Sequence, residues 1–326
     1  MKRIIGIGNP IVDEIAFVEE SFLEQIQGAK GGMELLESSQ LESIKSLLPN
    51  NGKGDKIPGG SAGNTAFALA RLGTQTGYLG KVGNCAIGEF YKTAFSELGG
   101  RTDSFKLGDI PNGNCLSLVT PDGQRTMRTS LGAATNLSPA EITKEDFLDY
   151  DHVHIEGYMI YNQSVLEKTL DLAKSNNCTI SYDLASFEIV NHMRDTVKTL
   201  LSDYVDILFA NEDEAAAFTN ESPFDPVKSA QYLNEYSQVA IVKLGAEGSV
   251  ISENKKVTKV KALPVDRVVD TTGAGDFWAA GFLHGWAKGK SLEESAWIGS
   301  LLGAAVVQNQ GGSLNERQWE SILNEL

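Results

Sequence analysis

Residues 270–276 read Asp-Thr-Thr-Gly-Ala-Gly-Asp, and the local structure that this stretch requires sets the frame for the whole chain. Residues 265–269 before it, Val-Asp-Arg-Val-Val, alternate enough to predict a β-strand. Residues 277–283 after it are mostly apolar and lack proline, which is typical of a buried helix. The sequence therefore predicts a strand-to-helix turn at residues 273–275, with Asp276 in the first turn of the helix.

This turn has the chemistry of an anion site. Free backbone N–H groups and the positive end of the helix dipole converge at a helix start, and glycines let a bulky anion come close. The carboxylate of Asp276 can accept a proton from a hydroxyl while the amides of Gly273, Ala274 and Gly275 hold charge on phosphoryl oxygens. Phosphoryl transfer from ATP to an alcohol needs this pairing. Short Gly motifs also occur by chance, so Asp276 as a simple helix cap is the alternative.

Composition limits the classes of protein to which the chain can belong. Its 326 residues are 41% hydrophobic and 22% charged, which suits one α/β unit with a sizeable core. The net charge of −15 argues against a nucleic-acid or anionic-membrane surface, and no apolar run approaches a membrane span. Cys85, Cys115 and Cys178 are too few and too scattered for a disulfide framework or a zinc site. We therefore expect a cytoplasmic protein.

The first predicted strand ends in Gly-Ile-Gly at residues 6–8, which resembles the start of a dinucleotide-binding motif. Ile11 stands where a third glycine is expected, and Pro10 prevents a helix from following at once. A dinucleotide-dependent oxidoreductase is therefore disfavoured. Asn9 and Asp13 follow the strand at the edge where α/β sheets place ligands. The carboxylate of Asp13 can accept hydrogen bonds from two sugar hydroxyls, although a turn residue is the alternative.

A second glycine-rich motif occupies residues 58–66, Pro-Gly-Gly-Ser-Ala-Gly-Asn-Thr-Ala, and precedes a predicted helix over 65–72. Small residues such as Gly59 and Gly60 suit a backbone pressed against a ligand, and Asn64 can both donate and accept hydrogen bonds. The alternative is a loop that only caps the helix. Strands and helices then alternate from residue 151 to 270, which predicts a mainly parallel sheet. Residues 115–119 and 125–129 predict a β-hairpin.

The motifs at 58–66 and 270–276 resemble, in the expected order, the N-terminal and C-terminal signatures of the ribokinase-like carbohydrate and nucleoside kinases, the PfkB family. The resemblance spans nearly the whole chain. It implies an α/β, ribokinase-like three-layer fold, with a mainly parallel central sheet flanked by helices, as a single kinase domain over residues 1–326. It also implies a small β lid made of two discontinuous segments, about 11–57 and 101–135.

The resemblance further implies an ATP-dependent phosphotransferase with an alcohol acceptor, which moves the γ-phosphoryl group of MgATP to a hydroxymethyl group. Asp276 is then the general base, and Arg125 is the lid arginine that reaches the transferred phosphate. The implied contacts to the acceptor come from Asn9, Asp13, Gly59, Gly60 and Asn64. Those to the nucleotide come from Asn211, Lys243, Gly245, Gly248 and Thr271.

Two of these implied roles, those of Glu214 and of residues 245–248, also have a purely structural interpretation, and the resemblance adds a possible cation site. Glu214 is implied to act on Mg²⁺ through water, although residues 211–214 also suit ordinary helix capping. Residues 245–248 form either a nucleotide loop or a hairpin turn. Asp270 and Thr272 occupy positions that bind a monovalent cation such as K⁺ in some relatives. The resemblance also suggests a homodimer formed through the lid.

The identity of the acceptor stays open at this point. Gly-Asn-Pro at residues 8–10 and Asp-Leu-Ala-Ser-Phe at 183–187 resemble the adenosine-kinase branch more than ribokinase. Bacterial sugar kinases share these features, so the acceptor is a small-molecule nucleoside, hexose or pentose. A non-catalytic sugar- or nucleotide-binding regulator on the same fold would keep Asp13 and Asn64 but dispense with a base. The presence of Asp276 therefore favours the kinase.

Overall fold

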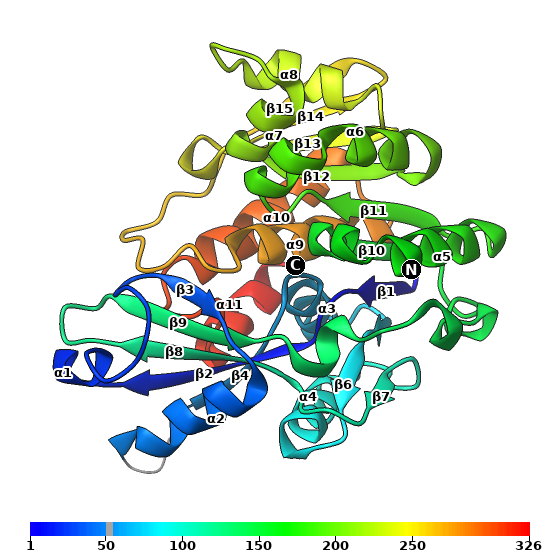
Figure 1. Cartoon of the computed structure of the whole chain (residues 1–326). Coiled ribbons are helices and arrows are strands. Elements are labelled where there is room, and N and C mark those ends of the chain that lie inside the picture. Colours follow the sequence, from blue (N-terminus) through cyan, green and yellow to red (C-terminus); the bar gives the residue numbers. More distant parts are fainter. Residues whose placement is uncertain (50–54) are drawn as a thin grey trace.

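A sheet of eight strands forms the centre of the computed structural model, which describes residues 1–49 and 55–326 (Figure 1). The spatial order is β15-β14-β13-β12-β11-β10-β1-β5. The six strands from β13 to β5 run parallel, while β14 and β15 are antiparallel additions at one edge. The mainly parallel sheet is therefore confirmed. The strands are β1 Ile4–Ile7, β5 Thr76–Leu79, β10 His152–Glu156, β11 Thr179–Asp183, β12 Ile207–Asn211, β13 Val239–Lys243, β14 Ser249–Glu253 and β15 Lys256–Val260.

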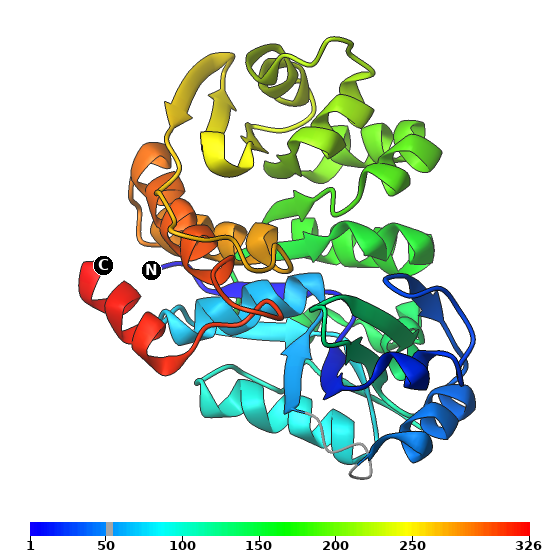
Figure 2. The same ribbon diagram turned by 90° about the vertical axis from the view of Figure 1, so that its left-hand side faces the viewer.

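Helices cover both faces of this sheet and make a three-layer structure (Figures 1 and 2). Buried side chains of α3, α9, α10 and α11 pack on one face, and those of α5, α6, α7 and α8 pack on the other. These helices are α3 Ser61–Arg71, α5 Gln163–Ser175, α6 Phe187–Tyr204, α7 Glu212–Thr219, α8 Pro226–Leu233, α9 Ala274–Ala287, α10 Leu292–Val306 and α11 Glu316–Glu325. Among the residues described, no helix combines the length and apolar character that a membrane span requires.

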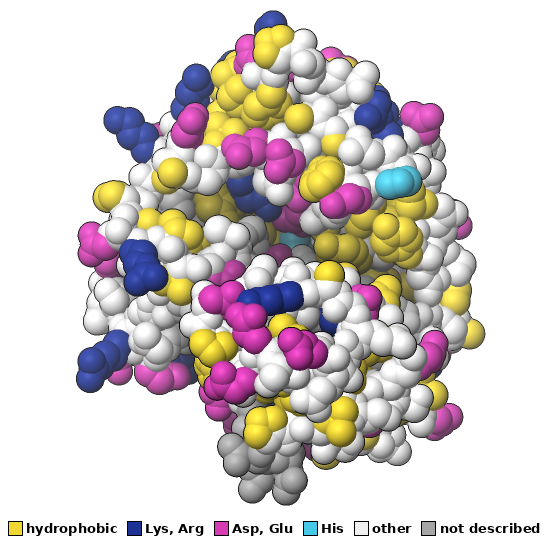
Figure 3. Space-filling model, turned by 60° about the vertical axis from the view of Figure 1, so that its left-hand side comes forward, with side chains coloured by type: hydrophobic (Ala, Val, Ile, Leu, Met, Phe, Trp, Pro, Cys, Tyr) yellow, Lys and Arg dark blue, Asp and Glu magenta, His cyan; other side chains and the backbone are white. Residues whose placement is uncertain are grey.

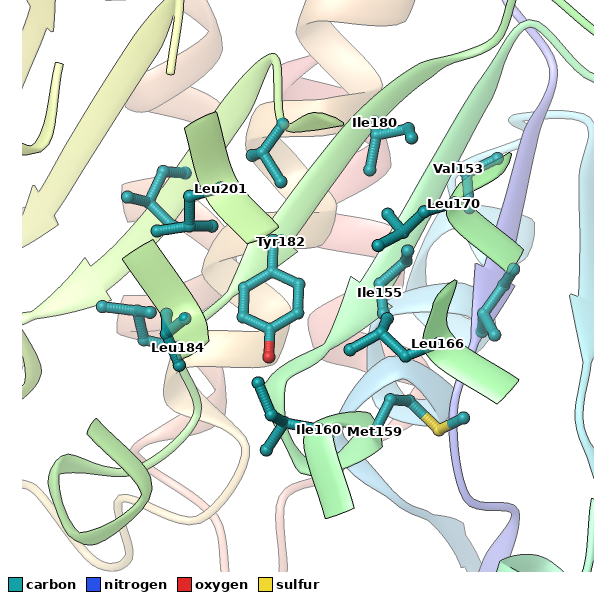
Figure 4. Close-up of a cluster of buried hydrophobic side chains, with 14 of the residues drawn as sticks. Val153, Ile155, Met159, Ile160, Leu166, Leu170, Ile180, Tyr182, Leu184 and Leu201 are labelled. Atoms are coloured by element: carbon teal, nitrogen blue, oxygen red, sulfur yellow. The ribbon is translucent and has the colours of Figure 1, made fainter. Parts of the chain in front are cut away.

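The core between the sheet and α5–α6 explains how the carboxyl ends of β10 and β11 are fixed (Figure 4). Val153 and Ile155 of β10 lie beside Ile180 and Tyr182 of β11, all pointing to the same face. They pack against apolar side chains of α5, α6 and the turns after the two strands: Met159, Ile160, Leu166, Leu170, Leu184 and Leu201. Burial of each such side chain contributes about 1.5–3 kcal/mol. Alternate residues point to the α9 face.

A second sheet of five strands, in the order β3-β9-β8-β2-β4, lies beside the large one (Figures 1 and 2). Its strands are β2 Ile11–Phe17, β3 Met33–Leu35, β4 Asp55–Gly59, β8 Gly113–Val119 and β9 Arg125–Ser130. The predicted hairpin is confirmed as the antiparallel pair of β8 and β9. One face of this sheet packs on α1 Glu20–Leu23 and α2 Ser38–Leu47. Part of the lid segment expected over 11–57 lies outside the described residues.

The remaining elements connect the two sheets. The short parallel strands β6 Lys81–Gly83 and β7 Lys106–Gly108 pair with each other, and α4 Ala86–Glu97 lies between them in the chain. Figure 3 shows that the molecule is hollowed between the large domain and the second sheet, with charged side chains around the hollow. The carboxyl ends of the parallel strands point toward the second sheet, so side chains from both parts meet there.

Two local expectations were wrong. Residues 265–269 form no strand, and Val268 and Val269 are 55% and 48% exposed. A strand needs a partner, and β15 already ends the large sheet on that side. The second difference is that α3 begins at Ser61 rather than at Thr65. Asn64 therefore lies in the first turn of this helix and not in the loop before it.

Candidate active site

The start of α9 has free backbone amides, as an anion site requires, although one of the three predicted amides is already engaged. Gly273 caps the helix with φ of 73°, a left-handed conformation that favours glycine. The N–H of Ala274 donates to the carbonyl of Thr271 at 3.1 Å, so this amide is already engaged. Phe277 donates back to Gly273 at 2.9 Å, which leaves the amides of Gly275 and Asp276 without a backbone acceptor among the described residues. The amide of Gly273 likewise donates to no backbone acceptor there, so the free amides are those of Gly273, Gly275 and Asp276, and a loop rather than a strand precedes them.

The carboxylate of Asp276 is fixed by two side chains from α3. Ser61 Oγ donates to Oδ1 at 2.7 Å, and Asn64 Nδ2 donates to Oδ2 at 2.8 Å. Thr65 Oγ1 also donates to the backbone carbonyl of Asp276 at 3.1 Å. Burial raises the pKa of Asp276 to about 7, although the hydrogen bonds from Asn64 and Ser61 work to lower it. The two glycine-rich motifs thus meet at one carboxylate, which is half-buried and suited to accept a proton near neutral pH.

Glu156 is a site residue that the sequence reasoning missed. It ends β10 on the α9 face, is 1% exposed, and accepts three hydrogen bonds. Its Oε1 accepts from Asn9 N at 3.0 Å and Asn9 Nδ2 at 2.6 Å, and its Oε2 accepts from Ala62 N at 2.9 Å. Burial raises the pKa of Glu156 to about 7 despite these bonds. Glu156 therefore ties the end of β1 to the start of α3 and sets the position of Asn9.

A buried ion pair lies on the same face, at the ends of β11 and β13. Lys243 Nζ donates to Asp183 Oδ2 at 2.8 Å, and both side chains are mostly buried. Asp183 Oδ1 accepts from the N–H of Ala185 at 3.0 Å. Burial works to lower the pKa of Lys243, but the charges of Asp183 and Glu214 outweigh it and leave the pKa above its ordinary value. Asp183 was not predicted as a site residue.

Asn211 and Glu214 form a capping box at the start of α7. Asn211 N donates to Glu214 Oε2 at 2.8 Å, Asn211 Nδ2 donates to Oε1 at 2.9 Å, and Glu214 N donates to Asn211 Oδ1 at 2.8 Å. Burial raises the pKa of Glu214, and the nearby charge of Asp183 adds to this. Both carboxylate oxygens are engaged, so a direct metal bond would break the cap. A water-mediated contact to Mg²⁺ fits this arrangement better.

Metal binding by protein groups alone finds no support in the described part of the chain. No group of three or more His, Cys, Asp or Glu side chains there is arranged to hold an ion. Mg²⁺ commonly keeps several waters and binds to substrate phosphates, with one or two carboxylates nearby. Glu214, whose two carboxylate oxygens accept hydrogen bonds from Asn211, is a carboxylate of the kind that could contact such an ion through water.

The second sheet contributes Asp13 and the glycine pair. A Cβ added at Gly59 would lie 2.6 Å from Asp13 Oδ2, so a larger residue there would displace this carboxylate. Gly60 has φ of 88°, and an added Cβ would lie 2.2 Å from the carbonyl oxygen of Asn9. Burial raises the pKa of Asp13, while the Cys115 thiol and the Arg125 charge work to lower it. Asn9, Asp13 and both glycines therefore lie together at the junction of the two sheets.

Arg125 joins the second sheet to the loop before α9. Its Nη1 donates to Asp270 Oδ2 at 2.7 Å, and its Nη2 donates to Ser117 Oγ at 3.0 Å. Asp270 Oδ1 accepts from the backbone and hydroxyl of Thr272 at 2.9 and 2.7 Å, and Oδ2 also accepts from Gly311 N at 3.0 Å. Burial works to raise the pKa of Asp270, but these hydrogen bonds and the Arg125 charge leave it below its ordinary value. Both oxygens of Asp270 are therefore occupied.

The other predicted nucleotide residues lie in turns. Gly245 and Gly248 flank the turn between β13 and β14, with φ of 52° and 95°. A Cβ at Gly248 would lie 2.0 Å from the carbonyl oxygen of Val260, whereas nothing lies within 4 Å of one at Gly245. The hairpin geometry alone thus explains Gly248. Thr271 is exposed, and the contact that the structure gives it is the backbone bond to Ala274.

Two aromatic side chains stand at the edge of the site. Tyr158 follows β10 and Phe187 begins α6, and they are 43% and 44% exposed. Burial raises the pKa of Tyr158 to about 12, and the charges of Glu156 and Asp276 add to the rise. Tyr158 therefore lies within electrostatic range of the proposed base and presents an accessible ring beside it.

Comparisons with known proteins identify the family of the chain. Residues 38–319 match the family described as pfkB family carbohydrate kinase. Adenosine kinase 2 of Arabidopsis thaliana is 25% identical over 334 residues, covering 96% of each chain. The structure of adenosine kinase from Sinorhizobium meliloti is similar with a TM-score of 0.85 and 31% identity, over 100% of this chain and 99% of that one. A probable sugar kinase from Rhizobium etli CFN 42 has a TM-score of 0.85 and 28% identity, over 99% and 98%.

Proposed function

Since the chain belongs to the pfkB family of carbohydrate kinases, and is therefore a sugar or nucleoside kinase, we propose that its acceptor is a purine nucleoside such as adenosine. The kinase class, the phosphotransferase activity on an alcohol and the ribokinase-like fold are confirmed, and the non-catalytic regulator is not favoured. The family uses ATP and Mg²⁺. The observation that carries the proposal is the 31% identity to an adenosine kinase over the full length of the chain.

The polar groups at the junction of the two sheets suit the ribose of a nucleoside. Asp13 offers carboxylate oxygens to neighbouring hydroxyls, and Asn64 reaches the carboxylate of Asp276 from the same helix that Gly60 begins. Asn9, held by Glu156, faces this region from the end of β1. Together these groups would hold the sugar with its hydroxymethyl group against Asp276, as a near-attack geometry requires.

The accessible rings of Tyr158 and Phe187 support a nucleoside in preference to a free sugar. A purine has two apolar faces that stack on aromatic side chains, whereas a hexose or pentose offers mostly hydroxyls. Tyr158 follows β10 and Phe187 follows β11 in the chain, so both come after the carboxyl ends of strands that end in Glu156 and Asp183. The similarity to a probable sugar kinase keeps hexoses and pentoses as the second candidate.

The reaction then follows from the chemistry of α9. Asp276 takes the proton of the acceptor hydroxyl as the acceptor oxygen bonds to the γ-phosphorus. The bond from the γ-phosphorus to the bridging oxygen of ATP breaks, and its electron pair stays on the β-phosphate of ADP. The free amides of Gly275 and Asp276 stabilise charge on the phosphoryl oxygens. Mg²⁺, when bound, neutralises phosphate charge, and Glu214 with Asn211 would hold its waters.

We treat residues 1–326 as a single domain, in which the second sheet and its Arg125 would act as a lid over the active site. In this proposal Arg125 leaves Asp270 and contacts the transferred group when the nucleotide binds. Closure of the sheet excludes water, which competes with the acceptor hydroxyl. Departure of Arg125 would remove the positive charge and one donor from Asp270 Oδ2, and a cation such as K⁺ could take its place, which would tie that predicted site to lid movement.

Two further parts of the proposal concern setting and assembly. The three cysteines are free thiols, which suits a reducing cytoplasm. The second sheet exposes Phe17, Met33 and Leu35 at 70%, 55% and 61%, which supports a homodimer through the lid. Neither the net charge of −15 nor its distribution favours nucleic acid or an anionic membrane as a partner.

A coupled assay of ADP release tests the acceptor. Adenosine, inosine, cytidine, ribose and fructose are compared at equal concentration with MgATP, and each product is identified by mass. We expect kcat/KM for adenosine to exceed that for either free sugar by at least about 100-fold, since the base adds contacts that a sugar lacks. Faster turnover of fructose or ribose would reject the nucleoside and favour the second candidate.

A further inference from the structure

A lysine ammonium lies buried beside the anion site, although the sequence gives Lys243 only as an implied nucleotide contact. Lys243 ends β13, and its side chain crosses the neighbouring strand β12 to reach Asp183 on β11. The side chains of Lys243 and Asp183 are 12% and 7% exposed, with Nζ and Oδ2 2.8 Å apart. The ammonium also lies 6.0 Å from the ring centre of Phe209 on β12. Proton transfer from the acceptor hydroxyl to Asp276 does not require the Lys243 ammonium, so that step does not explain why a cation is buried here.

The ammonium is adjacent to the free amides of α9. A Cβ built on Gly275 would lie 3.1 Å from Lys243 Nζ, closer than most real contacts. Gly275 is one of three residues at the start of α9, with Gly273 and Asp276, whose amides have no backbone acceptor among the described residues. Glycine at this position therefore leaves the space that the ammonium uses, and the same small volume borders the place where the phosphoryl oxygens would lie.

Several carboxylates surround Lys243, and they would repel a phosphoryl group unless a cation offset their charge. Asp183 on β11, Glu214 on α7 and Asp276 on α9 all act electrostatically on it, and His154 on β10 lies within range. Glu156 on β10 adds a further carboxyl group close to Asp276. A phosphoryl group entering this acidic setting is repelled unless fixed positive charge offsets the carboxylates. Arg125 lies on the second sheet and is paired with Asp270, whereas Lys243 is held within the large sheet.

We propose that Lys243 is a catalytic residue whose ammonium donates a hydrogen bond to a γ-phosphoryl oxygen during transfer. Asp183 keeps the ammonium in place, and the N–H of Ala185 keeps Asp183 in place. No bond is made or broken at Lys243, which stays protonated throughout, while the proton of the acceptor passes to Asp276. The inference rests on the phosphoryl transfer proposed above, but not on the identity of the acceptor.

Neutral variants test this proposal against a purely structural role for the ion pair. Lys243→Met alone leaves Asp183 buried without a partner, which destabilises the fold whatever the function. The double variant Lys243→Met with Asp183→Asn removes both charges. A structural pair predicts that the double variant regains both thermal stability and kcat. The proposal predicts that stability returns while kcat stays about 100-fold or more below wild type, the usual effect of losing one charge-stabilising donor.

A matched ion pair elsewhere gives the control. Lys106 and Asp146 are 19% and 6% exposed, with Nζ and Oδ1 2.7 Å apart, and they lie on β7 and in the loop before β10. Lys106→Met with Asp146→Asn should change thermal stability without changing kcat by more than about threefold. A kcat for the Lys243 and Asp183 double variant within that same threefold range would overturn the proposal.

Lys243→Arg decides the matter if the double variant does not fold. Arginine keeps the charge, so we expect kcat at least about 10-fold above that of Lys243→Met, with little change in the KM of the acceptor. Equal kcat for the arginine and methionine variants would contradict a charge contact. Failure of the acceptor assignment is separable, since all variants are assayed with whichever acceptor wild-type protein phosphorylates fastest, nucleoside or sugar.

Discussion

At the scale of single residues, the protein places an acid–base group where its protonation changes near neutral pH. Asp276 combines partial burial, which raises its pKa to about 7, with hydrogen bonds from Ser61 and Asn64 that hold the ionised form. A carboxylate at its ordinary pKa would be a weaker base toward an alcohol. The same balance is visible in Glu156, which stays buried while it fixes Asn9.

The first prediction concerns the pH dependence of catalysis. Since Asp276 must be ionised to accept the proton, kcat/KM should rise with pH and reach half its maximum near the pKa of about 7. Ser61→Ala removes a donor that lowers this pKa, so the midpoint should move to higher pH. Thr65→Val, which loses only the bond to the backbone carbonyl of Asp276, should leave the midpoint unchanged. A downward shift for Ser61→Ala would refute this explanation.

The second prediction concerns stability. Burial raises the pKa of Glu156 to about 7 in the folded protein, above its value in the unfolded chain. At a pH between these two pKa values, Glu156 is protonated in the folded state and ionised in the unfolded state. Its contribution is therefore fully present below the unfolded pKa and is lost as pH rises through 7. Relative to Glu156→Gln, wild-type protein should lose about 2–3 kcal/mol of unfolding free energy between pH 5 and pH 8. Urea titrations at both pH values measure this, and a difference independent of pH would contradict it.

At the scale of elements, β9 is tied to the loop before α9 by Arg125 and Asp270. Arg125→Met should reduce kcat by at least about 100-fold, since it removes the arginine that we propose contacts the transferred phosphoryl group, and should speed amide exchange in β9. Arg101, an exposed arginine paired with Asp103 and Asp149, provides the control, and Arg101→Met should change neither. Unchanged exchange in β9 for Arg125→Met would show that the ion pair does not hold the second sheet.

The turn after β11 carries a strained residue. Ala185 has φ of 62°, a left-handed conformation that costs an L-residue free energy, and its N–H holds Asp183. Ala185→Gly should raise the unfolding free energy by about 0.5–1 kcal/mol, since glycine adopts this conformation freely. Ala217→Gly in α7 should lower it by about 1 kcal/mol. Loss of stability for Ala185→Gly in thermal unfolding would reject the strain.

The sequence predicted a helix, which depends mainly on its own residues, better than a strand, which depends on a partner strand elsewhere in the chain. The helix after Asp276 was correctly predicted, because a helix that is apolar on all sides is typical of a protein core. The strand expected at 265–269 does not form, because alternation cannot supply a partner strand. Glu156 and Asp183 were missed, although each is an acidic residue ending a buried strand, the same signal that identified Asn9 after β1. Had every polar residue at the end of a predicted buried strand been considered, Glu156 and Asp183 would both have been identified.

At the scale of the whole molecule, the fold brings distant parts of the chain to one place. The motifs at 58–66 and 270–276 meet through Ser61, Asn64 and Asp276. Their meeting was implied by a resemblance, since spacing alone does not define a contact across more than two hundred residues. The ion pair of Lys243 and Asp183 could not be foreseen in that way, because it depends on the register of β11, β12 and β13.

The architecture also explains why an acidic protein can handle phosphate. The net charge of −15 is spread over the chain, while the positive groups near the site are the start of α9, Lys243 and Arg125. The first belongs to a helix, Lys243 to the large sheet and Arg125 to the second sheet. Local positive groups therefore lie near the place where the phosphoryl group would pass, although the chain as a whole is acidic.

One measurement tests the central claim most directly: single-turnover phosphorylation of the preferred acceptor by Asp276→Asn, with ATP and acceptor binding measured on the same protein by calorimetry. Asparagine keeps the shape and can still bond to Ser61, but it cannot take a proton. We expect both ligands to bind within about threefold of wild type and the rate of transfer to fall by about 1,000-fold. Transfer at the wild-type rate would show that Asp276 is not the base.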